Sequence, residues 1–145
     1  MKSNWVISVV AVFGVLFVFG CNSGFKPVAN GADGGMISGT VTIDSKFAKK
    51  IPPHGVVFIM AKPQEQGPPV AVKRLPIGTF PLSFELMKAD VMMSDVPFQG
   101  EFFVVVRIDQ DGLAGPAQKG DLEGKTKKPI PVGHPPVSIK VDKIY

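Results

Sequence analysis

Apolar and polar residues alternate along four short stretches of the chain. Residues 37–43 place apolar or small side chains at every second position, with serine, threonine and aspartate near or between them. The same period returns at residues 82–86, 101–109 and 137–141. A two-residue period puts apolar side chains on one face of an extended strand and polar ones on the other. We therefore expect half-buried β-strands at these positions.

Three further segments read as strands of other kinds. Residues 55–62 are apolar on both faces, which is typical of a strand in the middle of a covered sheet. Residues 70–75 predict a shorter strand in which Lys73 and Arg74 turn toward water. Residues 129–132 begin with proline, which is tolerated at a sheet edge, and predict a brief edge strand there.

The segments between these strands predict turns and loops. Asp44 is expected to cap one helical turn that ends before the prolines at 52 and 53. Residues 87–96 are irregular, with room for one further helical turn. Asp111 and Gly112 form a turn dipeptide, and the Gly-rich, charged residues 113–128 read as mostly loop.

Six or seven short strands with turn signals about every ten residues predict an all-β sandwich or barrel. Strands do not alternate with helices, so no parallel sheet is expected. The composition agrees, because 14 prolines and 16 glycines spread along the chain disfavour long helices. A single cysteine excludes an intrachain disulfide and a Cys-rich zinc site.

The first residues of the chain have the pattern of an export signal. Lys2 supplies a positive charge, and residues 5–19 are almost wholly apolar, a length that suits a signal peptide and is short for a membrane span. Residues 18–21 read Val-Phe-Gly-Cys and resemble the bacterial lipobox, although Phe19 departs from its usual small or aliphatic residue. We expect Cys21 to be acylated and to become the first residue of the mature chain. The alternative is a retained single-span anchor with a chance cysteine.

The expected organisation has three parts. Residues 1–20 form the lipoprotein signal peptide, residues 21–35 a flexible tether without any period, and residues 36–145 the β-sandwich domain. Two or three acyl chains suffice for stable anchoring. The protein is therefore expected in a bacterial cell envelope, lipid-anchored and facing the periplasm, with the inner or outer membrane left open by Asn22 after the cysteine.

Candidate sites for a metal or haem are weak. His54 and His134 lie in proline-flanked loops, and soft ligands accompany them at Met60, Met87, Met92 and Met93. The spacing fits no ligand pattern, and Met60 reads as core filler on an apolar strand. We expect exposed loop histidines and no cofactor.

The sequence also gives little support for a calcium site or a catalytic site. Residues 109–112 resemble the start of a calcium loop, but its sixth and twelfth positions are Ala114 and Gly120, where glycine and glutamate are required. Asp121 and Glu123 flank an apolar residue and read as part of a tight turn fixed by Gly120 and Gly124. No residue sits in a nucleophile setting, so no catalytic residue, no small-molecule substrate and no enzyme activity is expected.

The mild excess of positive charge changes this picture little. Residues 125–128 read Lys-Thr-Lys-Lys and predict a solvated basic loop. The run lacks interleaved aromatic residues, and the protein is expected to be exported. Nucleic acid is therefore not an expected partner.

Seven segments, taken in order, resemble one known family: residues 37–41, 57–59, 70–75, 81–84, 92–94, 106–108 and 120–124. The family is the C-terminal periplasmic domain of the c-type cytochrome biogenesis protein CycH, also called CcmI. The resemblance implies an immunoglobulin-like β-sandwich. In that family the domain is part of a protein that holds apocytochrome c for the haem ligation machinery, so the resemblance implies a role in that process. The two membrane helices and the tetratricopeptide-repeat domain of full-length members are not found here.

Two functions follow from this resemblance. The first is a non-catalytic, protein-binding accessory factor in periplasmic c-type cytochrome maturation, with apocytochrome c or haem-lyase subunits as partners. Strand addition at the strand of residues 137–141 or at residues 129–132 would provide the binding edge. The second is a general structural or interaction lipoprotein that keeps the sandwich but has no role in haem attachment.

Overall fold

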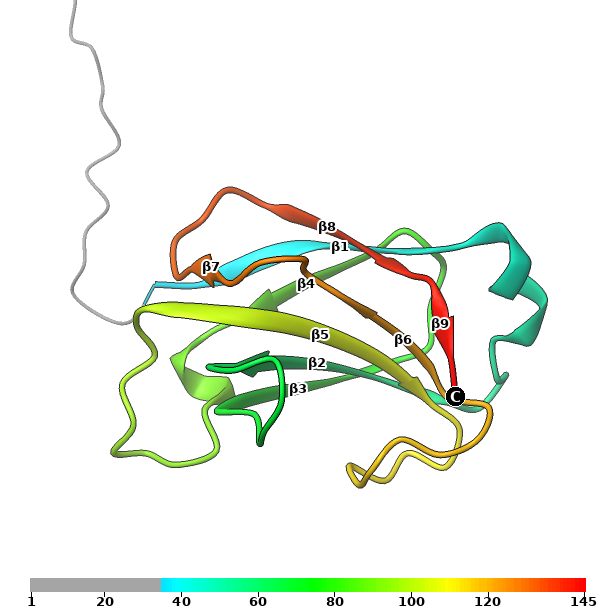
Figure 1. Cartoon of the computed structure of the whole chain (residues 1–145), viewed down its shortest axis with the longest axis horizontal. Helices are drawn as coiled ribbons and strands as arrows, with labels where there is room; N and C mark the ends of the chain where they lie inside the picture. The colour runs from blue at the N-terminus through cyan, green and yellow to red at the C-terminus, as the bar shows by residue number, and fades with distance from the viewer. Residues whose placement is uncertain (1–34) are drawn as a thin grey trace, which may run out of the picture.

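The computed structural model describes residues 35–145, which fold into a sandwich of two β-sheets (Figure 1). The smaller sheet has the order β4 (Leu82–Leu86), β1 (Ile37–Ile43), β8 (Val137–Val141). The larger sheet has the order β3 (Ala71–Pro76), β2 (Val56–Lys62), β5 (Glu101–Asp109), β6 (Leu122–Lys125), β9 (Lys143–Ile144). A short strand, β7 (Ile130–Pro131), also pairs with β5. The predicted all-β fold is confirmed.

The N-terminal predictions fall on a part of the chain that the structure does not describe. The signal peptide at 1–20, the lipidation site Cys21 and the tether as far as residue 34 all lie outside the described residues. Within residues 35–145, no helix is long and apolar enough to cross a membrane.

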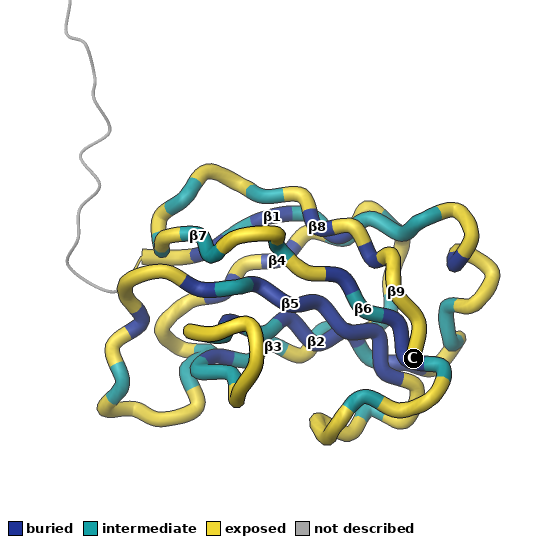
Figure 2. Tube along the Cα trace, in the orientation of Figure 1, coloured by how far each residue is buried: buried dark blue, intermediate teal, exposed yellow. Residues whose placement is uncertain are grey.

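The core lies between the two sheets and is built from the predicted alternating residues (Figure 2). On β5, the side chains of Phe102, Val104, Val106 and Ile108 point inward and are 5% exposed or less. Phe84 of β4 packs against them from the smaller sheet, and is 4% exposed. These residues therefore anchor the sandwich, as the two-residue period predicts.

Two 3₁₀-helical turns lie where the sequence predicts helical turns. The first, η1 (Ser45–Lys50), begins after Asp44, whose side chain accepts a hydrogen bond from the Lys46 backbone N–H at 3.1 Å. The second, η2 (Lys88–Asp90), follows β4. There the Asp90 carboxylate accepts a hydrogen bond from the Met87 backbone N–H at 2.9 Å. In both turns an aspartate therefore pairs with a backbone N–H that the turn itself leaves free.

The prediction that residues 113–128 are mostly loop is wrong for β6. Leu122 is fully buried in the core, and Glu123 pairs with Arg107 across the ladder rather than forming a tight turn. Gly124 lies inside the strand, where its missing side chain lets the backbone pack directly against Lys140. A glycine and two charged residues in four positions concealed this strand, because burial here depends on a contact distant in sequence.

Residues 35–145 form nine strands, more than the six or seven predicted, and one pair of them is parallel. The first and last long strands, β1 and β8, run parallel, with Gly39 opposite Val137. After β8 the chain crosses to the larger sheet and forms β9, a strand of two residues. A pair that joins the two ends of a domain, and a strand this short, leave no local pattern in the sequence.

The strand edges differ in how open they are. β7 is docked on β5, and β8 has β1 on one side while β6 packs against its C-terminal half through Gly124. On the edge strand β3, Lys73 does not turn freely toward water as predicted, because its Nζ lies 3.3 Å from the Asp90 carboxylate. An inward-turned charge of this kind protects a sheet edge from unwanted pairing.

Candidate functional site: a groove on the outer face of the larger sheet

The outer face of the larger sheet has an apolar row across its three central strands. Met60 lies opposite Val72 of β3 on one side and opposite Val105 of β5 on the other. All three point away from the core, and Val105 is nevertheless only 5% exposed. Met60 was expected to fill the core, but it lies half-buried on this outer face. The strand predicted to be apolar on both faces therefore provides the floor of a surface site.

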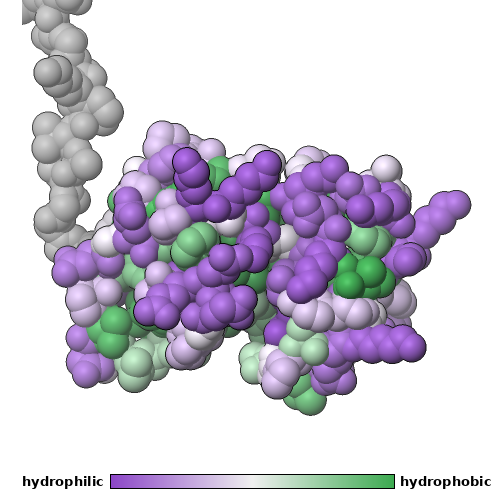
Figure 3. Space-filling view, viewed as in Figure 1, coloured by the Kyte–Doolittle hydropathy of each residue, from purple (hydrophilic) through white to green (hydrophobic). Residues whose placement is uncertain are grey.

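Two loops form the walls of a groove of about 400 Å³ above this row. One wall comes from the loop after β2, with Gly67 and Pro69, and the other from the loop between β5 and β6, with residues 114–117. Met92 and the C-terminal Tyr145 also contribute to the lining. The space-filling view shows a notch between two lobes at the lower edge of this face (Figure 3). The floor belongs to a sheet, so the site is held rigidly, while its walls are loops.

A second hollow of about 410 Å³ adjoins the groove on the other side of the loop after β2. Its lining consists mainly of prolines 63, 68 and 69 with Met92 and Met93. The two methionines are 56% and 58% exposed, which is unusual for large apolar side chains. Flexible thioether side chains of this kind adapt to different partner surfaces.

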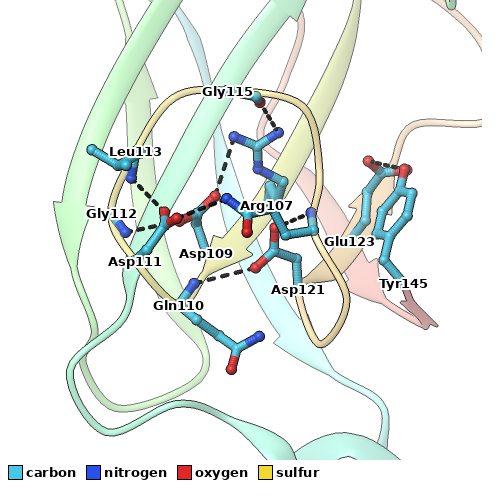
Figure 4. Close-up of polar contacts among 11 residues, drawn as sticks. Arg107, Asp109, Gln110, Asp111, Gly112, Leu113, Gly115, Asp121, Glu123 and Tyr145 are labelled. Atoms are coloured by element: carbon cyan, nitrogen blue, oxygen red, sulfur yellow. Dashed lines mark hydrogen bonds and ion pairs between the residues drawn. The ribbon is translucent and has the colours of Figure 1, made fainter.

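Arg107 ties one wall of the groove to its floor (Figure 4). Its Nη1 donates a hydrogen bond to the Gly115 carbonyl oxygen at 2.8 Å, and its Nη2 lies 3.3 Å from Asp109 Oδ2. The guanidinium carbon is 5.7 Å from the centre of the Phe58 ring. Arg107 is only 6% exposed, and its Nε has no hydrogen-bond partner among the described residues. A buried cation in this setting depends on Asp109 for its charge balance.

The carboxylates of the loop between β5 and β6 hold the loop's own backbone. Asp109 accepts a hydrogen bond from Gly112 N–H at 2.8 Å, and Asp111 accepts one from Leu113 N–H at 2.9 Å. Asp121, which is 1% exposed, accepts hydrogen bonds from Gln110 N–H at 3.2 Å and Gln118 N–H at 2.7 Å. Gly112 and Gly120 adopt positive φ angles of 71° and 100°, as turns in this loop require. These oxygens are therefore committed to shaping the wall of the groove.

Asp109 and Asp111 titrate in opposite directions. Burial raises the pKa of Asp109, and the neighbouring Asp111 carboxyl raises it further. The Leu113 N–H lowers the pKa of Asp111, and its hydrogen bond with Asp109 adds to that effect. The interaction of the two carboxyl groups therefore separates their protonation steps.

As the pH falls from 7, Asp109 should take up its proton above the ordinary aspartate pKa of about 3.9, and Asp111 below it. The raised pKa of Asp109 means that its contribution to stability is present at low pH and is lost as pH rises through the folded-state pKa. The lowered pKa of Asp111 gives a contribution that is present above the unfolded pKa and lost as pH falls through the folded value. Carboxyl ¹³C NMR titration of the two side chains checks this order, and the reverse order would contradict it.

The groove carries one unbalanced charge. Three charged side chains line it, those of Lys62, Arg107 and Glu123. Arg107 is balanced by Asp109, and Glu123 accepts a hydrogen bond from the Tyr145 hydroxyl at 2.8 Å and lies 3.7 Å from Lys143 Nζ. Lys62 makes no ion pair with any residue that the structure describes. Among the charged side chains that line the groove, Lys62 is therefore the one without an ion pair to a described residue.

The two histidines do not converge. His54 follows η1 at one end of the sandwich, and His134 follows β7 at the other (Figure 1). Among residues 35–145, no three His, Cys, Asp or Glu side chains are arranged to hold a metal ion.

Residues 37–142 match the family described as the cytochrome c-type biogenesis protein H Ig-like domain. The chain belongs to this family. The match covers most of the chain and confirms both the resemblance and the immunoglobulin-like sandwich. No curated protein matches the chain. One solved structure that is similar to it is an alternative pilotin from the type II secretion system of Vibrio cholerae, with 18% identity and a TM-score of 0.48, over 75% of this chain and 96% of the pilotin chain.

Proposed function

We propose that this protein is a non-catalytic, protein-binding accessory factor in periplasmic c-type cytochrome maturation. Family membership supports the pathway, and the groove on the outer face of the larger sheet supports the binding role. The groove carries the proposal, because an apolar floor between two loops offers a surface for a partner chain. The partners we propose are apocytochrome c or haem-lyase subunits.

The chemistry of the groove suits a transient complex. Apolar area removed from water contributes roughly 25 cal/mol per Å² to the free energy of binding. The flexible side chains of Met60 and Met92 in the groove can adjust to different partners. A short groove of about 400 Å³ buries only a few partner side chains. We expect micromolar affinity, on the order of −8 kcal/mol, which allows a substrate protein to be passed on.

Deleting the gene should lower holocytochrome c without lowering apocytochrome transcripts. Haem staining and transcript quantification measure the two effects.

The purified full-length protein should retain apocytochrome c or a haem-lyase subunit in a pull-down. Met60→Asp should abolish retention, because it places a charge in the apolar floor, whereas Ser138→Asp on the exposed face of β8 should not. Normal haem staining together with no retained partner would leave the general structural lipoprotein as the better description.

We also propose that Cys21 is diacylated and anchors the domain on the periplasmic side of a bacterial membrane. The single cysteine directly after an apolar segment of signal-peptide length supports this. Cys21→Ser should leave the precursor unacylated and change its membrane fractionation, measured with a radiolabelled fatty acid. Wild-type processing and unchanged membrane association in the Cys21→Ser variant would contradict the anchor.

A further inference from the structure

The free charge and the apolar row of the groove lie at a fixed spacing. Met60 and Lys62 project from the same face of β2, two residues apart, so their Cα atoms are separated by about 7 Å. An extended polypeptide that runs along β2 repeats its side chains on one face at the same spacing. In such a segment, one side chain can therefore contact Met60 while the next side chain on the same face, two residues along, contacts Lys62.

The charge balance of the groove determines which side chains fit. Glu123 and Arg107 are neutralised by Lys143 and Asp109, so a ligand meets the uncompensated charge of Lys62 alone. Val72 and Val105 beside Met60 favour an apolar side chain at that point. We infer that the groove selects an extended polypeptide segment in which an apolar residue and an acidic residue are separated by one position. This inference rests on the proposed protein-binding function.

The loop after β2 favours a polypeptide over another apolar anion such as a fatty acid. Three of residues 63–69 are prolines without an N–H. The remaining N–H groups and the C=O groups of this segment make no backbone–backbone hydrogen bond to any residue that the structure describes, so they are free to pair with a peptide. Gly67 in the groove wall has open space where a side chain would stand, and its backbone is accessible from the groove. Residues 63–68 are exposed, so water pairs with these groups in the free protein. Backbone amides of a ligand can replace that water, whereas an alkyl chain offers no hydrogen bond in exchange.

Three designed peptides test this selection against the full-length protein in lipid nanodiscs. In each, serine fills every second position, and the remaining positions alternate between leucine and glutamate, leucine and lysine, or alanine and glutamate. By fluorescence anisotropy, the Leu–Glu peptide should bind tightest. Lys62→Glu should weaken the Leu–Glu peptide about fivefold and strengthen the Leu–Lys peptide, because one exposed charge pair contributes on this scale.

Lys49→Glu is the matched control. Lys49 is exposed on η1, does not line the groove and makes no ion pair with a described residue. The Lys49→Glu substitution changes the net charge by the same amount as Lys62→Glu, and it should leave the order of the three peptide affinities unchanged. Circular dichroism of both variants should match the wild type, which separates lost binding from lost folding.

The inference is overturned if the Leu–Glu and Leu–Lys peptides bind equally, or if the two variants behave alike. It is also overturned if decanoate displaces the Leu–Glu peptide at equal concentration, since the groove would then be a fatty-acid site. The peptides contain no cytochrome sequence. If the peptides do not bind as expected, the pull-down and haem-staining tests of the proposed function are unaffected. If those two tests fail, the peptide preference of the groove can still be measured.

Discussion

Replacing Arg107 with alanine should lower the free energy of unfolding by about 3–5 kcal/mol. Among the described residues, the change removes the only cation within ion-pair distance of Asp109, whose side chain is 2% exposed. It also removes the hydrogen bond that ties Gly115 to the sheet. A buried carboxylate without its cationic partner is the source of most of the loss. Urea denaturation of the full-length protein, followed by far-ultraviolet circular dichroism, measures it.

Two further variants separate the charge effect from lost packing. In the double variant Arg107→Met with Asp109→Asn, most of the stability should return, since a buried pair replaced as a whole is often nearly neutral. Arg74→Ala removes an exposed arginine from the same face of the larger sheet and should change stability by about 0.5 kcal/mol or less. Equal losses in the Arg107 and Arg74 variants would contradict the buried ion pair.

The sequence predicts the long strands well because their burial follows from local alternation. Strand β5 runs from Glu101 to Asp109, as predicted, and its inward residues are the predicted ones. Strand β6 was missed because two of its four residues are charged and one is glycine. Its place in the sheet depends on the close approach of Gly124 to Lys140, which no local pattern encodes.

The groove could be predicted only in part. A strand apolar on both faces, at residues 55–62, signals that its outer face is covered. Arg107 in the middle of an apolar run is a second signal, since an arginine there must find a partner. What covers the face could not be predicted, because the loop after β5 is held by tertiary contacts such as that of Arg107 with Gly115.

Charged residues on short strands show the same limit. Lys73 reads as solvent-facing by its type, yet it lies on the inward side of β3 and pairs with Asp90 of η2. The path of the chain after β4 places η2 beside β3. The residue pattern of β3 alone gives no information about that path. The prediction for Lys73 rested on residue type and not on a period, so it missed both the face and the partner of this side chain.

Phe84→Ala should lower the free energy of unfolding by about 3–5 kcal/mol, because it removes a buried aromatic ring and leaves a cavity. Phe84 lies opposite Gly39 in the ladder, and its ring covers the bare backbone of β1 there. Gly39 cannot be enlarged to refill the space, since an added Cβ would overlap the Val137 carbonyl oxygen on the adjacent strand. Ser83→Ala, on the exposed side of the same strand, should change stability by about 0.5 kcal/mol or less. Chemical denaturation compares the two variants, and equal midpoints would show that the ring does not anchor the smaller sheet to the core.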